Sequence, residues 1–193
     1  MAIVVLDPGH GGPTKIGDSS PNNATGQSGL KEKAVTLDIA KRAQKLLAAD
    51  GIDVRLTRSS DKNLGLEDRA GVAKAAKADA FVSIHFNGFD GVAQGTETWH
   101  HRSASPDSRA LAHTVQAAVQ KATALKDRGV KKAGFAVLRP SFHHAATAAC
   151  LVEISFMDIA AEEARLKTDP YKDNVAKAIA SAIRGWLVAD QRS

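Results

Sequence analysis

Short apolar runs alternate along the chain with longer segments whose apolar residues recur every three or four positions. The short runs predict strands at residues 2–6, 52–57, 79–87, 95–100 and 148–155. The longer segments predict helices at residues 30–49, 66–77, 106–124 and 170–188. Strands that alternate with helices predict an α/β fold, a mainly parallel twisted sheet flanked by helices on both faces.

The helix predicted at residues 30–49 shows the pattern most clearly. Val35, Ile39 and Ala43 share one face at helical spacing, and Gly51 stands where a helix commonly ends. No internal repeat and no linker divides the chain. We therefore expect residues 1–193 to form a single domain.

A long segment rich in glycine, serine, asparagine and proline, residues 11–29, follows the first predicted strand. Unstructured loops of this length inside a compact domain are usually functional. The strand itself runs into His10 with glycines on both sides, in VVLDPGHGG. A phosphate-binding loop is one interpretation, but neither GxGxxG nor GxxxxGK[ST] occurs here. The other interpretation is that the loop presents an imidazole to a reactive centre.

Composition narrows the possible partners. Of 193 residues, 44% are hydrophobic and 24% charged, as in an ordinary soluble globular protein. The net charge of +5 favours attraction to anionic polymers. The basic residues are scattered and aromatic residues make up only 5%, so we expect no nucleic-acid binding. No apolar run approaches the roughly 20 residues of a membrane span, and the first residues show no export signal.

The only cysteine, Cys150, excludes an internal disulfide. It lies in an apolar run, where a thiol is typically a small core residue with little reactivity.

Ionisable residues stand at or near the ends of three apolar strands: His10, His85 and Glu153. Glu32 adds a fourth at the start of the long helix. Sites in α/β sheets gather at the carboxyl ends of strands, and such groups are costly to bury unless they are paired or bind a metal. Two histidines and one glutamate with an open position make a catalytic zinc site, and the remaining glutamate can act as general base.

Each of these residues also has a simpler interpretation. A histidine at a strand end can be a hydrogen-bonded core residue, and Glu32 can partner the dipole of its own helix. Glu153 is harder to explain in this way, because CLVEISF is apolar on both sides. Four such residues together favour the metal site.

The same residues carry a resemblance to a known family. The fragments, in order, are VVLDPGHGG, GLKEKAVTLDIAKRAQKLL, GIDVRLTRSSD, LEDRAGVAKAAKADAFVSIHFNG, GTETWHH, KKAGFAVLRP and CLVEISFMD. Together they resemble the zinc-dependent N-acetylmuramoyl-L-alanine amidases of the AmiC-like class. These enzymes cleave the amide between the lactyl group of muramic acid and the first L-alanine of the peptide stem.

The resemblance implies roles for particular residues. His10, Glu32 and His85 would hold one zinc ion, and Glu153 would be the catalytic glutamate. Phe86, Ser155 and the ending MD depart from the family pattern, which bears on the shape of the groove rather than on the four reactive positions. The segment from Val92 to Ala133 shows no inserted autoinhibitory helix, so the resemblance implies a catalytic domain without that gate.

Further expectations concern the surroundings of the site. Asn87 lies two residues after His85, on the same side of the strand, and is a candidate for substrate contact. Arg139, in VLRP, is a candidate for lining the cleft. Arg58 and Arg69 flank the loop between them and are expected to hold it through ion pairs.

The leading hypothesis is a zinc amidase that acts on peptidoglycan or muropeptides. Two alternatives remain open: an inactive wall-binding module, and another zinc peptidase of the cell wall such as a carboxypeptidase. We expect a monomer that acts at the bacterial cell wall or periplasm. Without an export signal, its origin could be a phage-type lysin, an injected effector or an excised domain of an exported enzyme.

Overall fold

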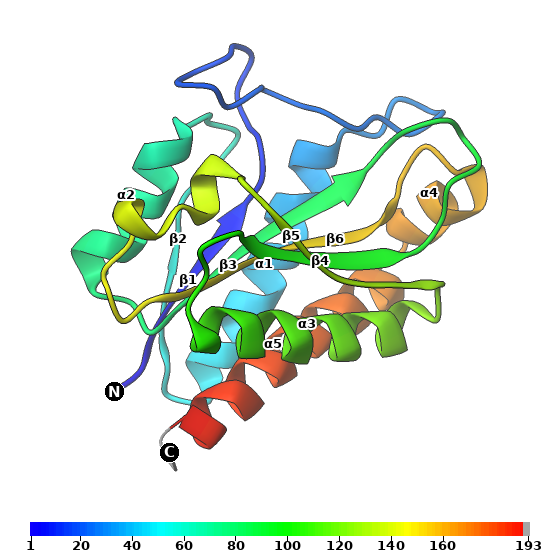
Figure 1. The fold of residues 1–193 in the computed structure, drawn as a ribbon. Coiled ribbons are helices and arrows are strands. Elements are labelled where there is room, and N and C mark those ends of the chain that lie inside the picture. The colour runs from blue at the N-terminus through cyan, green and yellow to red at the C-terminus, as the bar shows by residue number, and fades with distance from the viewer. Residues whose placement is uncertain (191–193) are drawn as a thin grey trace.

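A computed structural model describes residues 1–190. Six strands form one sheet in the order β2-β1-β3-β6-β4-β5 (Figure 1). The strands are β1 (Ile3–Pro8), β2 (Asp53–Leu56), β3 (Ala80–Asn87), β4 (Thr96–His101), β5 (Asp127–Ala133) and β6 (Ala148–Phe156). The strands β2, β1, β3 and β6 are mutually parallel, β4 is antiparallel to β6, and β5 is parallel to β4. The prediction of a mainly parallel sheet is confirmed.

Helices cover both faces of this sheet, as predicted (Figure 1). The helices are α1 (Glu32–Ala49), α2 (Leu66–Ala76), α3 (Pro106–Thr123), α4 (Ala160–Leu166) and α5 (Asp169–Asp190), with the 3-10 turns η1 (Ala136–Leu138) and η2 (Pro140–Phe142). On one face, α1, α3 and α5 pack over the strands, while α2 and η1 pack on the other. None of the helices in residues 1–190 has the length and hydropathy needed to cross a membrane.

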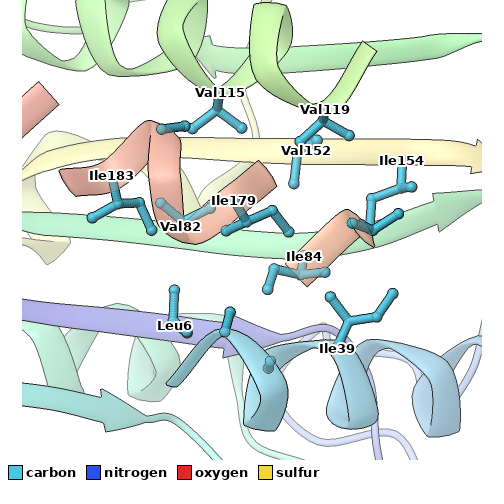
Figure 2. Packing of buried hydrophobic residues seen from close by; sticks show 14 of the residues in the cluster. Leu6, Ile39, Val82, Ile84, Val115, Val119, Val152, Ile154, Ile179 and Ile183 are labelled. Carbon is cyan, nitrogen blue, oxygen red and sulfur yellow. The ribbon is translucent and has the colours of Figure 1, made fainter. Parts of the chain in front are cut away.

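The alternation of side chains along the strands creates these two cores. Val82 and Ile84 of β3 point to the face of α1, α3 and α5, where they meet Ile179 and Ile183 of α5 (Figure 2). Phe81, which precedes Val82 and points to the opposite face, packs in the cluster with α2 and η1. Because both faces of the central strands are covered at this level, most of their residues on both faces are apolar.

Two elements were not predicted from the sequence, β5 and α4. The β5 segment, DRGVKKA, is mostly charged and has a glycine in its middle, so it lacks the apolar alternation of a strand. It is a strand because it pairs with β4. The helix α4 has only seven residues, too few to show a helical period.

The first prediction tests the larger core. Ile179→Ala removes a fully buried side chain between the sheet and its helices, and we expect a loss of about 2–5 kcal/mol in the free energy of unfolding. The control is Lys177→Ala, an exposed position on the same helix, which should change that free energy by less than about 0.5 kcal/mol. Urea unfolding of both variants measures the difference, and equal losses would contradict this assignment of the core.

Candidate active site

His10, Glu32 and His85 lie together at the carboxyl end of the parallel strands. His10 follows β1, Glu32 is the first residue of α1, and His85 belongs to β3. Glu32 Oε1 is 3.2 Å from His10 Nε2 and 3.1 Å from His85 Nδ1. One ligand atom from each of the three residues lies within 4.8 Å of the others, so they form a group that could hold a metal ion.

A missing side chain allows this approach. A Cβ placed on Gly9 would lie 2.3 Å from Cε1 of the His85 ring, so no larger residue fits there. His10, the next residue, has a left-handed backbone with φ of +61°. Its ring meets the His85 ring edge to face, with centroids 4.9 Å apart. Gly9 is therefore explained by this crowding between β1 and β3, whereas Gly11 and Gly12 have positive φ and lie against the backbone of Lys62 and Asn63.

Two arginines bind the backbone carbonyls of the turn that carries His10. Arg69 donates from Nη2 to the His10 carbonyl at 2.7 Å, and Arg58 donates from Nη2 to the Gly9 carbonyl at 2.9 Å. Both also donate to the Pro8 carbonyl at 2.9 Å. Three successive carbonyls are thus held by buried guanidinium groups.

The carboxylate that balances Arg69 is Asp7, which is fully buried in β1. Arg69 Nη1 lies 2.9 Å from Asp7 Oδ1, and the hydroxyls of Thr57 and Ser83 each donate to Asp7 at 2.6 Å. Burial by itself would raise the pKa of Asp7, but Arg69 and the two hydroxyl bonds hold that pKa below its usual value. Arg69 thus forms an ion pair, but its partner lies in β1 beneath the His10 turn rather than in the loop between Arg58 and Arg69.

Neighbouring groups fix the orientation of the candidate ligands. His10 Nδ1 lies 3.0 Å from the Ser20 carbonyl and donates to it when it carries the proton, which leaves Nε2 free as an acceptor or metal ligand. Glu32 Oε2 accepts from the Ala24 backbone N–H at 2.8 Å, and Oε1 accepts from the Phe86 N–H at 3.0 Å. The long loop and β3 therefore clamp Glu32 from both sides.

The ionised form of Glu32 and the protonated form of His10 stabilise each other. Burial by itself would raise the pKa of Glu32, yet its bonds to His10 and His85 hold the pKa well below its usual value. Burial would lower the pKa of His10, but the bond and the charge of Glu32 raise it. Two imidazoles and one carboxylate form the nitrogen and oxygen donor set typical of zinc.

Glu153 lies beside this group on β6, directly opposite His85 in the sheet register. Side chains paired in this way share one face of the sheet. Among the described residues, no hydrogen-bond partner is found for the buried atom Glu153 Oε2. Burial raises the pKa of Glu153 well above its usual value, and the negative charges of Glu32 and Glu97 raise it further. The carboxyl is therefore adjacent to the ligand group and has a strong tendency to hold a proton.

Asn87 and Arg139 have different surroundings. Asn87, at the end of β3, donates from Nδ2 to Glu97 Oε1 at 3.2 Å. Glu97 is the residue of β4 that pairs with Glu153 of β6. The Arg139 guanidinium stacks on the Phe142 ring at 4.8 Å, in a cavity shared with Gly17 and other residues of the long loop and α2. The structure does not join Arg139 to the ligand group by any described contact, and the substrate roles of both residues stay predictions.

Glu97 was not predicted as a site residue from the sequence. The available signal was its position two residues before Trp99 in GTETWH, which places both side chains on the same face of the strand. The sequence also placed Arg58 and Arg69 at the loop between them. Both arginines do contact that loop, Arg58 at the Ser60 carbonyl and Arg69 at the Leu64 carbonyl and the Asn63 side chain, through hydrogen bonds. They also bind the carbonyls of the His10 turn, which no spacing in the sequence indicates. Cys150 is buried as expected, and burial raises the pKa of its thiol.

Fold and site together define an α/β protein with a candidate catalytic metal centre at the carboxyl ends of its parallel strands. Comparison with known families agrees: the family model described as N-acetylmuramoyl-L-alanine amidase matches residues 4–185. The chain belongs to this family.

Individual relatives show how far the likeness extends. The chain is 36% identical over 178 residues to N-acetylmuramoyl-L-alanine amidase LytC of Bacillus subtilis (strain 168), which covers 91% of this chain and 34% of LytC. It is 36% identical over 198 residues to an endolysin of Bacillus phage SPP1, which covers 99% of this chain and 68% of the endolysin. The chain thus spans about a third of LytC and about two thirds of the endolysin.

A solved structure confirms the fold. The catalytic domain of CwlV, an N-acetylmuramoyl-L-alanine amidase from Bacillus (Paenibacillus) polymyxa var. colistinus, superposes with a TM-score of 0.85 at 35% identity. The match covers 97% of this chain and 98% of that domain. The order of strands and helices described above is therefore that of an amidase catalytic domain.

The second prediction tests the support beneath His10. Asp7→Asn leaves the Arg69 guanidinium buried without its counter-charge, and we expect a loss of about 3–5 kcal/mol in the free energy of unfolding at neutral pH. Because the pKa of Asp7 is lower in the folded state, its contribution is present above the unfolded value of about 3.9. That contribution is lost as the pH falls through the lower folded pKa.

Urea unfolding from pH 7 to pH 3 measures this effect. The difference between Asp7→Asn and the unsubstituted protein should be largest at neutral pH and shrink as the solution becomes acidic. Asp18→Asn is the control, since the Asp18 side chain is 89% exposed and its pairing with Lys15 is long, at 3.5 Å. A deficit that stays constant with pH would show that the charge of Asp7 is not what stabilises the turn.

Proposed function

We propose that this protein is a zinc-dependent N-acetylmuramoyl-L-alanine amidase that hydrolyses the amide between N-acetylmuramic acid and L-alanine in peptidoglycan. The observation that carries the proposal is the ligand group of His10, Glu32 and His85, whose donor atoms lie within 4.8 Å of one another, with the Glu153 carboxyl on the adjacent strand. Membership of the amidase family supports the choice of reaction.

The residues present fit one zinc ion. His10 Nε2, His85 Nδ1 and Glu32 Oε1 would be the ligands, since these atoms already face one another. The Ser20 carbonyl and the backbone N–H groups of Ala24 and Phe86 hold the ligands in place. When bound, zinc lowers the pKa of a water ligand to about 7 and polarises a carbonyl group.

Glu153 is proposed as the general base and acid. Its unpartnered oxygen, Oε2, can accept the proton of the attacking water and then return that proton to the amine nitrogen of the departing L-alanine. Because the proton is returned, the carboxylate is restored at the end of each cycle. Its place in the middle of β6 keeps the carboxyl beside His85 during both transfers.

The substrate and the place of action follow from the relatives only as proposals, since the chain covers part of their length. We propose residues 1–193 as one catalytic domain that acts on peptidoglycan in the bacterial wall or periplasm, as a monomer. The net charge of +5 is suited to an anionic wall. An inactive binding module is disfavoured, because all four reactive positions carry the expected side chains.

The third prediction concerns the metal. Chelation should abolish hydrolysis of purified peptidoglycan, and added zinc should restore it. Mass spectrometry of the products should show an intact stem peptide that begins with L-alanine, whereas a carboxypeptidase would release a residue from the other end of the stem. Full activity in protein shown to be free of metal would overturn the proposal.

The fourth prediction separates the two glutamates. Glu153→Gln should keep stoichiometric zinc and lose about 10²–10⁴-fold in turnover, because an amide cannot accept the proton of the water. Glu32→Ala should lose zinc affinity, because two imidazoles alone hold the ion weakly. Metal content and rate are measured on the same two preparations. A metal-free Glu153→Gln beside a zinc-loaded Glu32→Ala would reverse the assignment.

A further inference from the structure

An extra residue interrupts β5 where it pairs with β4. Thr96 pairs with Asp127 and Thr98 with Val130, so three steps along β5 match two along β4. Gly129 lies inside this bulge with φ of +77°, a conformation that favours glycine. Its N–H donates to the Asp127 carboxylate at 2.8 Å, which holds the bulge in shape.

The bulge changes which side chains share a face. In a regular strand, residues three positions apart point to opposite faces. With the extra residue between them, Arg128 and Lys131 both reach Glu97 of β4. Arg128 Nε lies 2.5 Å and Lys131 Nζ 2.6 Å from the same oxygen, Glu97 Oε2.

Contacts within the protein already fix the position of the Arg128 side chain. A Cβ on Gly95 would lie 2.7 Å from Arg128 Cγ, so the absence of a side chain at Gly95 makes room for the arginine stem. The guanidinium lies over the Phe156 ring at 5.0 Å. Glu97 takes only the Nε donor at short range, and the remaining contact, from Nη1 to the Gln94 carbonyl, is long at 3.4 Å. The outer donors of the fork therefore remain available.

Lys131 is arranged in the same way. Its ammonium group lies over the Trp99 ring at 5.2 Å and uses one short bond to Glu97. The side chains of Lys131 and Arg128 are 32% and 30% exposed, while that of Glu97 is 6% exposed. Two half-exposed cations thus share one buried carboxylate, which leaves one positive charge in excess.

This cluster lies next to the proposed reaction centre. Glu97 pairs directly with Glu153 across β4 and β6, so both side chains point to the same face. Neighbouring strands are about 4.8 Å apart, which places β5 about 10 Å from β6. Arg128 and Lys131 reach back from β5 towards Glu97. A carboxylate two residues along an extended peptide lies about 7 Å from the first amide, within reach of these two cations.

We propose that Arg128 and Lys131 bind a carboxylate of the peptide stem, the α-carboxylate of the residue after L-alanine, and so determine which stems are cleaved. Glu97 is the positioning residue that holds both cations on the site face. The proposal rests on the proposed function for its substrate. An arginine fork beside an ammonium group suits a carboxylate better than the neutral carboxamide, in which an NH₂ donor replaces one of the two acceptor oxygens.

The test compares two muramoyl tripeptides that differ only at the second stem residue, where the α-carboxylate is free in one and a carboxamide in the other. The unsubstituted protein should cleave the free acid with a kcat/KM about tenfold or more above that of the amide. Arg128→Gln and Lys131→Met should each reduce this preference several-fold, mainly by raising KM for the free acid. Lys132→Gln is the matched control, since Lys132 is exposed and points to the opposite face of β5.

A binding measurement keeps this inference separate from the proposed reaction. The two released tripeptides are titrated against each variant by calorimetry, without turnover, and circular dichroism confirms that each variant is folded. If the unsubstituted protein binds the free acid more tightly than the amide and Arg128→Gln loses this preference, the carboxylate site is supported. If neither muramoyl tripeptide is cleaved, that result contradicts the amidase reaction alone and leaves the carboxylate site standing. Equal binding of acid and amide by the unsubstituted protein, or a preference that survives both substitutions, would overturn the carboxylate site.

Discussion

The close contact between Gly9 and the His85 ring is the constraint on which the site depends. β1 and β3 are hydrogen-bonded neighbours, so a side chain at the turn after β1 would occupy the space that the β3 histidine fills. Without one, His10 and His85 reach the same oxygen of Glu32 from two strands. Arg58 and Arg69 hold the turn by its carbonyls, and Asp7 balances the buried charge of Arg69. The two guanidinium groups thus supply hydrogen-bond donors to the buried carbonyls of this turn.

Burying Glu32 would be costly if its charge were alone. Here two backbone N–H groups and two imidazoles surround the carboxylate, so its ionised form is stabilised without access to water. The contrast with Glu153 is informative. Glu153 lies in the same region but has an oxygen without a partner, and the nearby negative charges oppose its ionisation. The surroundings of Glu32 therefore stabilise its ionised form, whereas those of Glu153 favour its protonated form.

The sequence predicted the elements whose apolar pattern is strong, and with them the residues that the fold brings together. The strands around Val82 and Val152 and the helix around Ile39 were clear, so the strand-end positions of His85 and Glu153 could be identified. The roles of Arg58 and Arg69 could not be predicted, because they bind backbone carbonyls about fifty to sixty residues away, and a carbonyl has no sequence signature. β5 was missed because tertiary pairing, rather than local propensity, makes DRGVKKA a strand.

The reversal of chain direction at β4 explains why so many polar groups meet on one edge. In an entirely parallel sheet, only the carboxyl ends of strands reach the edge where sites form. β4 and β5 run against β6, so their first residues lie beside the last residues of β3 and β6. Glu97 and Arg128 come from strand beginnings, whereas His85 and Glu153 come at or near strand ends. The antiparallel pair therefore extends the reaction centre sideways along the sheet, and it supplies the cations that the parallel part lacks beside Glu153.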